Sequence, residues 1–127
     1  QGLTEAEALE REIAVDVADF QFKDIDRAVI EGEAEGFAKL VVQKGSRFRG
    51  GGRILGATVV GAHAGEVLHE IVLAMGSGLR IKDIAKAIHA YPTRAQVTRR
   101  AVNAFYARRL FSPPARHLAR WINAILR

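Results

Sequence analysis

Two apolar segments joined by a glycine-rich stretch constrain the fold more than any other feature of this chain. Residues 36–45, GFAKLVVQKG, and 53–63, RILGATVVGAH, are rich in the Val, Ile, Leu and Phe that strands favour. The connecting stretch GSRFRGGG is dominated by glycine, which permits tight turns. Neither a Gly-Lys-Ser/Thr sequence nor a helix follows these glycines, so a phosphate-binding loop is disfavoured. The pattern predicts an antiparallel hairpin.

A third strand precedes this hairpin in the sequence. Residues 14–22, AVDVADFQF, alternate apolar and polar side chains, with a slip around Ala18 that is typical of a β-bulge. Three- and four-residue spacing of apolar side chains predicts helices at 3–13, 65–78 and 80–88, the last with Ile88 on its apolar face. We therefore expect an α+β domain in which an antiparallel meander packs against helices.

The C-terminal third is predicted to be helical. Thr93 is placed as an N-cap with Gln96 as its capping-box partner, which predicts a helix that begins at 93 and runs to about 110. Pro113 and Pro114 then separate a last amphipathic helix. We assign residues 1–111 to one domain and 112–127 to a helical extension. This extension could pack on its own domain, dock on another domain or, as the least expected outcome, contact a membrane surface.

The charges are distributed unevenly along the chain. There are 19 Lys and Arg against 14 Asp and Glu, a net charge of +5, yet no acidic residue follows Asp83. Five arginines lie at positions 94, 99, 100, 108 and 109 of the predicted helix. Three interpretations stay open: a solvated surface, a basic module that binds nucleic acid or an anionic membrane, or a basic end that meets the acidic stretch before Gly36 in a dimer.

Several classes of site are disfavoured by the sequence. The chain has no cysteine, which excludes a disulfide, a thiolate metal site or a redox dithiol within it. His63, Glu66, His69 and Glu70 lack the four-residue His-to-His spacing of a helical zinc site, so no metal is expected. No apolar run reaches the roughly 18 residues of a membrane span, and we expect a cytoplasmic location.

Four motifs in a fixed order resemble one known family. GLTEAEA (2–8), GFAKLVV (36–42), RILGATVVGAHAGEVLHEIVLAM (53–75) and HAYPT (89–93) are similar to segments of the C-terminal interface domain of the pyridine nucleotide-disulfide oxidoreductases. This is the family of dihydrolipoamide dehydrogenase, glutathione reductase and mercuric reductase. The resemblance extends from Gly2 to about Phe105, and it implies the dimerisation-domain fold of the FAD- and NAD-linked reductases.

This resemblance implies that the chain is one domain of a homodimeric flavoprotein. The parent would bind FAD and NAD(P)H through FAD- and NAD(P)-binding domains, whereas this chain lacks their Gly-x-Gly-x-x-Gly motif and is expected to bind neither cofactor alone. The chain alone is expected to be inactive, and no nucleic acid is expected as a partner. In the family, HAYPT corresponds to a corner that reaches the partner subunit's flavin and redox disulfide.

The resemblance also assigns candidate site residues. The family's acid/base histidine and its orienting glutamate correspond to Tyr91 and Gln96, and the Tyr91 and Pro92 backbone would lie near the partner's flavin, with a cis peptide between them. A phenol titrates near pH 10 and a carboxamide does not titrate, so proton transfer at this position is disfavoured. His89 is a possible substitute, although a packed and hydrogen-bonded ring is favoured. We expect an electron acceptor that needs no proton partner, as in mercuric-reductase-like chemistry, rather than a dithiol.

Overall fold

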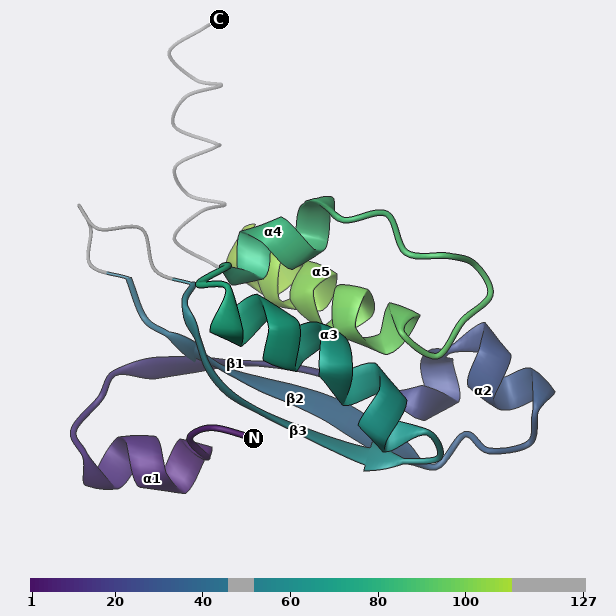
Figure 1. The fold of residues 1–127 in the computed structure, drawn as a ribbon, viewed down its shortest axis with the longest axis horizontal. Helices are drawn as coiled ribbons and strands as arrows, with labels where there is room; N and C mark the ends of the chain where they lie inside the picture. Colours follow the sequence, from purple (N-terminus) through teal and green to yellow (C-terminus); the bar gives the residue numbers. More distant parts are fainter. Residues whose placement is uncertain (46–51, 111–127) are drawn as a thin grey trace, which may run out of the picture.

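A three-stranded antiparallel sheet forms the centre of the molecule (Figure 1). The computed structural model describes residues 1–45 and 52–110. Strands β1 (Val15–Gln21), β2 (Gly36–Gln43) and β3 (Ile54–Gly61) lie side by side in the order β1-β2-β3. The helices are α1 (Glu5–Glu10), α2 (Asp26–Ile30), α3 (Ala64–Gly76), α4 (Ile81–Lys86) and α5 (Gln96–Leu110), with a 3-10 turn η1 (Phe22–Asp24). The predicted α+β meander is confirmed.

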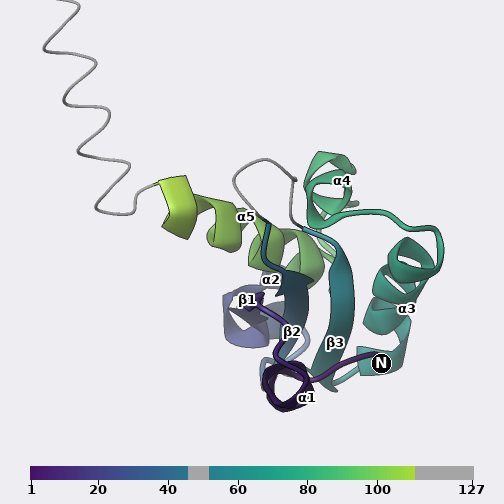
Figure 2. The ribbon, with the colours of Figure 1, turned by 90° about the vertical axis from the view of Figure 1, so that its left-hand side faces the viewer.

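The two faces of the sheet have different neighbours. Helices α3, α4 and α5 lie on one side and α1 lies on the other, with α3 against β3 and α5 against β1 (Figures 1 and 2). Ala18, Leu40 and Ala57 are paired across the three strands and are buried under the helices. Because side chains alternate across a strand, their neighbours Asp19, Lys39 and Thr58 belong to the opposite face. One face therefore supplies the core.

The core consists of two clusters. The larger lies between the sheet and helices α3 to α5 and includes Leu40, Val42, Ile71, Ile81 and Val102. The smaller lies at one end of the sheet and consists of Phe22, Ile25, Ala28, Ala38, Val67 and Val97. Burial of apolar area stabilises the fold by roughly 25 cal/mol per Å². The smaller cluster therefore holds η1 and α2 against the starts of α3 and α5, where the candidate site lies.

The structure corrects the predicted bulge in the first strand. Strand β1 pairs with β2 without a break from Val15 to Gln21, and the irregularity lies between Val41 and Val42 in the pairing of β2 with β3. The change of pattern at Ala18 has another cause: Val15 lines a groove on the outer face, whereas Ala18 is buried on the helix face. Apolar side chains on both faces of β1 look like a slip in the sequence.

The predicted boundaries of two helices were also wrong. Helix α5 begins at Gln96, because the Thr93 hydroxyl donates a 2.7 Å hydrogen bond back to the Ala90 carbonyl instead of capping the helix. Helix α4 ends at Lys86, which leaves Ile88 96% exposed rather than on an apolar face. The sequence did not predict α2. The predicted extension at 112–127 lies outside the described residues.

Candidate functional site

The segment between α4 and α5 forms the candidate site, and we call residues 89–96 the corner. The segment leaves α4 and runs to the end of the sheet where α2 lies (Figure 1). The Tyr91–Pro92 peptide is cis, as the family resemblance implied. Both residues are exposed, and 68% of Tyr91 is accessible. The corner therefore presents a tyrosine and a proline to the outside of this chain.

The hydroxyl of Tyr91 is engaged by an acidic residue of α2. It donates a hydrogen bond of 2.9 Å to the carboxylate of Asp26. This bond and the negative charge of Asp26 raise the pKa of Tyr91 above the usual 10.0, while the charge of Arg100 acts in the opposite direction. A phenol held in this way keeps its proton at neutral pH. Tyr91 can donate a hydrogen bond but cannot serve as a base there.

His89 is anchored inside the molecule. Its side chain is 5% exposed, and its Nε2 lies 2.7 Å from a carboxylate oxygen of Glu70 on α3. Its Nδ1 lies 3.2 Å from the carbonyl oxygen of Ala87. Both ring nitrogens thus face acceptors of the same chain. The ring ties the corner to α3.

Gln96 and Tyr91 are not joined by a hydrogen bond in the described part of the chain. Gln96 is the first residue of α5, and it lines a polar cleft together with Arg99, Arg100 and Asn103. The Tyr91 hydroxyl points instead to α2. The two residues at the positions of the family dyad therefore do not act as a hydrogen-bonded pair within this chain.

Arg94 holds the corner to the segment around α2. Its side chain is 8% exposed, and it donates to the Glu31 carboxylate through Nε at 2.9 Å and to the Glu33 carboxylate at 2.6 Å. Arg27 binds the same Glu31 group with its Nε at 2.6 Å. These two arginines, Arg27 first, hold the pKa of Glu31 below its usual 4.5. We call Arg94, Glu31 and Glu33 the clamp.

Sequence reasoning did not identify the clamp as a unit. It noted both the acidic stretch before Gly36 and the basic helix, and it left open that they meet in a dimer. In the structure Glu31 and Glu33 pair with Arg94 of the same chain. The separation of 61 to 63 residues along the chain hides this pairing, and opposite charge in two distant segments was the only available signal.

Two further arginines of α5 pair with strand β1. Arg108 binds the carboxylate of Asp19 at 3.1 Å, and Arg109 binds that of Asp16 at 2.9 Å. Arg109 also lies over the ring of Phe105, 4.9 Å from its centroid. Much of the positive charge of this helix is therefore matched within the chain.

Two other kinds of site are absent from residues 1–45 and 52–110. No group of three or more His, Asp or Glu side chains there is arranged to hold a metal ion. No helix in the same ranges has the length and apolar character that a membrane span requires.

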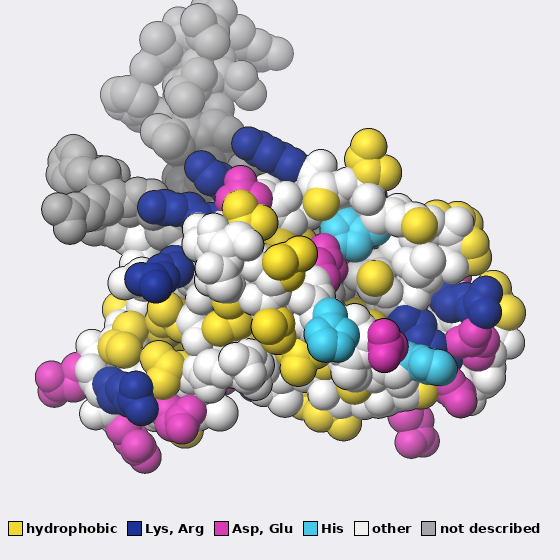
Figure 3. Space-filling view, in the orientation of Figure 1, with side chains coloured by type: hydrophobic (Ala, Val, Ile, Leu, Met, Phe, Trp, Pro, Cys, Tyr) yellow, Lys and Arg dark blue, Asp and Glu magenta, His cyan; other side chains and the backbone are white. Residues whose placement is uncertain are grey.

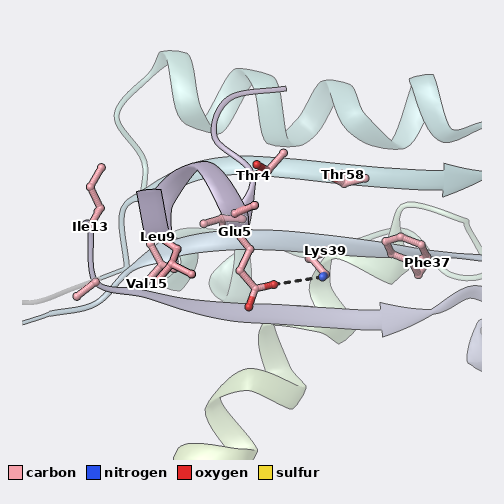
Figure 4. A pocket seen from close by; sticks show the side chains of 11 residues that line it. Thr4, Glu5, Leu9, Ile13, Val15, Phe37, Lys39 and Thr58 are labelled. Atoms are coloured by element: carbon pink, nitrogen blue, oxygen red, sulfur yellow. Dashed lines mark hydrogen bonds and ion pairs between the residues drawn. The ribbon is translucent and has the colours of Figure 1, made fainter. Parts of the chain in front are cut away.

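An apolar groove lies on the outer face of the sheet (Figure 4). It has a volume of about 740 Å³ and lies between α1 and the strands. Lys39 and Glu5 form an ion pair at 3.4 Å beside it. The remaining lining residues are mostly apolar: Thr4, Ala6, Leu9, Ile13, Ala14, Val15, Phe37, Val41 and Thr58. Leu9 is 79% exposed, so the groove is open on this chain.

A second apolar surface lies on the outer side of α3. Figure 3 shows hydrophobic side chains gathered over this helix in the middle of the view. Leu73 is 69% exposed, and Val72 and Leu79 are also exposed. Ile88 follows α4 and precedes His89, whose ring is bonded to α3. We call these four residues the α3 patch.

The sequence of the chain is similar to one domain of a family of known proteins. Residues 1–102 match the family described as "Pyridine nucleotide-disulphide oxidoreductase, dimerisation domain". The dihydrolipoyl dehydrogenase of Chlamydia trachomatis is 36% identical over 115 residues, which are 91% of this chain and 24% of that protein. The dihydrolipoyl dehydrogenase of Bacillus subtilis is 37% identical over 100 residues, covering 79% of this chain and 20% of that protein. The chain spans about a quarter or less of these relatives.

Solved structures show the same fold. LpdA from Mycobacterium tuberculosis superimposes with a TM-score of 0.72 at 18% identity, over 82% of this chain and 22% of that one. The Cu(II) complex of the HOCl-induced flavoprotein disulfide reductase RclA from Escherichia coli also gives 0.72, at 21% identity, over 81% of this chain and 22% of that one. Family match, relatives and fold agree, and the chain belongs to the pyridine nucleotide-disulphide oxidoreductases as their dimerisation domain.

Proposed function

We propose that this chain is the interface domain of an FAD-dependent NAD(P)H oxidoreductase that works as a cytoplasmic homodimer. In this proposal the corner of one subunit enters the active site of its partner. The observation that carries the proposal is the exposed Tyr91–Pro92 unit at the position of the family corner. The clamp and the His89–Glu70 bond support it, because they fix this exposed unit from two sides.

The α3 patch is the proposed contact between the two copies. Leu73 is 69% exposed and Ile88 is 96% exposed, and exposed large apolar side chains often mark a contact with another protein. A twofold interface uses the same patch on both subunits, so one apolar helix face is sufficient to make it. Burial of these side chains against a second copy would remove them from water.

The corner has a group that fits the edge of a flavin. In the described part of the chain, the carbonyl oxygen of Tyr91 accepts no hydrogen bond, and the residue is exposed. This oxygen is therefore available to a donor from outside the chain. We propose that this carbonyl and the Pro92 ring face the partner's flavin. When bound, FAD would take up hydride equivalents from NAD(P)H and pass them to the acceptor.

The rest of the cofactor would have to be held elsewhere. Dinucleotide-binding folds place the phosphates at the end of a parallel strand, whereas the described sheet of this chain is an antiparallel meander. The groove beside α1 is the proposed docking surface for the FAD- and NAD(P)-binding domains of the parent. Its apolar lining and its position on the face without the core helices support this assignment.

The chemistry of the corner indicates the class of acceptor. Tyr91 keeps its proton at neutral pH, Gln96 does not titrate, and His89 is tied to Glu70. Neither Tyr91 nor Gln96 can pass a proton as the family's histidine–glutamate dyad does, and the His89 ring is buried against α3 of its own chain. We therefore propose an acceptor that takes no proton from this corner, such as a metal ion, or a quinone that takes its two protons from water, rather than a disulfide.

The test is the activity of the full-length parent enzyme. NAD(P)H oxidation would be measured with lipoamide-type disulfides, quinones and divalent metal ions side by side. We expect turnover with a quinone or a metal ion and little with disulfides. Tyr91→His with Gln96→Glu would restore the dyad and should raise disulfide turnover selectively. Rapid disulfide turnover by the unaltered parent would contradict this assignment.

The charge arrangement of the described residues weakens the nucleic-acid and membrane alternative. Arg94, Arg108 and Arg109 pair with acidic groups of the same chain. Ion pairs of this kind reduce the positive charge that is available to a polyanion.

A further inference from the structure

Two arginines of α5, Arg99 and Arg100, differ from the other arginines of residues 94–109. Arg94, Arg108 and Arg109 each have an acidic partner, but Arg99 and Arg100 have none within 4.0 Å among residues 1–45 and 52–110. The Nε atom of Arg99 is buried and has no hydrogen-bond partner in the same ranges. A covered donor without an acceptor is destabilising, so an unpaired guanidinium of this kind calls for an explanation.

The two arginines line one cleft together with two carboxamides. Arg99 and Arg100 each lie three or four residues from both Gln96 and Asn103, so the four side chains share one side of the helix. They line a cleft of about 240 Å³. Every one of these side chains can donate a hydrogen bond, and none is acidic. The cleft thus combines two positive charges with amide donors and contains no carboxylate.

We propose that this cleft binds an oxyanion, a phosphate or a carboxylate, carried by a small molecule. Guanidinium groups form charge-assisted and often bidentate hydrogen bonds with either group, and the amides of Gln96 and Asn103 add neutral donors. The volume is too small for more than the anionic group and its immediate neighbours, so the remainder of the ligand would extend outside the cleft. An anion in the cleft would balance the two charges that have no counterpart in the described chain.

The cleft adjoins the corner. Gln96 belongs to both, and Arg100 is near enough to Tyr91 for its charge to act on that hydroxyl. The proposal does not depend on the flavoprotein assignment, because the four residues belong to this chain alone. It can therefore fail while the proposed function stands, and the reverse is also true.

The test is an NMR titration of the 127-residue chain with inorganic phosphate and, separately, with acetate. Ionic strength is held constant with sodium chloride, because screening alone shifts signals of exposed charges. The readouts are the side-chain amide signals of Gln96 and Asn103 and the Nε–H signals of the arginines. We expect saturable shifts of these signals with phosphate, acetate or both, and a loss of about tenfold or more in affinity for Arg99→Gln.

Arg108→Gln is the matched control. It removes the same charge from the same helix, but from an exposed residue that is already paired with Asp19. Its affinity for phosphate should stay within about twofold of that of the unaltered chain. The proposal is overturned by equal losses of affinity in both variants, or by signals that respond to neither anion.

Discussion

Replacement of Arg94 by methionine removes the positive member of the clamp and keeps most of the side-chain volume. The guanidinium is 8% exposed and donates to two carboxylates and to the carbonyl of Glu33, the last at 3.3 Å. Loss of one partner from a fully buried ion pair costs about 3–5 kcal/mol, because it leaves an uncompensated charge in the interior. Exposed pairs are worth only about 0–1 kcal/mol.

The cost of breaking the clamp should lie between these two limits. The side chains of Glu31 and Glu33 are 29% and 50% exposed, so both carboxylates would remain solvated, and Glu31 would keep its bond to Arg27. We therefore expect Arg94→Met to lower the free energy of unfolding by about 2 kcal/mol. The loss should be accompanied by faster amide exchange in the corner, because the clamp is one of the contacts that attach the corner to the rest of the chain.

The assay is urea unfolding followed by circular dichroism, with amide exchange of residues 89–96 as the local readout. Arg100→Met is the matched control, since this exposed arginine has no acidic partner in the described chain. Its effect should stay within about 0.5 kcal/mol. The reasoning is refuted if the two variants lose equal stability, or if Arg94→Met leaves both stability and corner exchange unchanged.

Three further predictions concern stability. Gly56→Ala should cost about 2 kcal/mol, because a Cβ there would lie 1.9 Å from the Leu3 carbonyl oxygen. The amides of Leu3 and Ala57, which join residues 1–3 to β3, should then exchange faster, and normal protection of both would contradict the prediction. Thr98→Val should raise the unfolding free energy by about 1 kcal/mol in urea, because the buried Thr98 hydroxyl has no partner in the described structure, and a loss would show that the hydroxyl is bonded. Arg27 and Arg94 lower the pKa of Glu31 in the folded chain below its usual 4.5. The clamp therefore makes its full contribution to the unfolding free energy above pH 4.5, and this contribution is lost as the pH falls through the lower pKa of the folded state. The stability difference between Arg94→Met and the unaltered chain should therefore shrink below pH 4.5, and a constant difference in acid would contradict this cause.

The sheet and the long helices were predictable because their signals are local. Val, Ile and Leu in two runs around a glycine-rich stretch specify a hairpin, and the apolar spacing of 65–78 specifies α3. The fold of the family followed from four motifs in order. The cis Tyr91–Pro92 peptide was likewise expected from one of these motifs and is present.

Two kinds of feature were not predictable: those that depend on contacts between distant segments, and one local hydrogen bond that replaces a helix cap. Helix α2 has five residues, too few for a periodic pattern, and it is held by Ile25 and Ala28 in the smaller core cluster. The start of α5 was placed three residues early because the Thr93 hydroxyl bonds to Ala90, a local competitor that sequence spacing does not reveal. The bonds of Tyr91 to Asp26 and of His89 to Glu70 likewise join different elements.

The mass of the chain in solution tests the dimerisation proposal most directly. Sedimentation equilibrium at low and high salt should give twice the chain mass, because the contact is apolar and salt screens only charges. Leu73→Glu, on the exposed face of α3, should give a folded monomer, while Lys23→Glu on η1 should stay dimeric. A monomer under all conditions, or a dimer that Leu73→Glu does not weaken, would contradict the assignment of the α3 patch as the subunit interface.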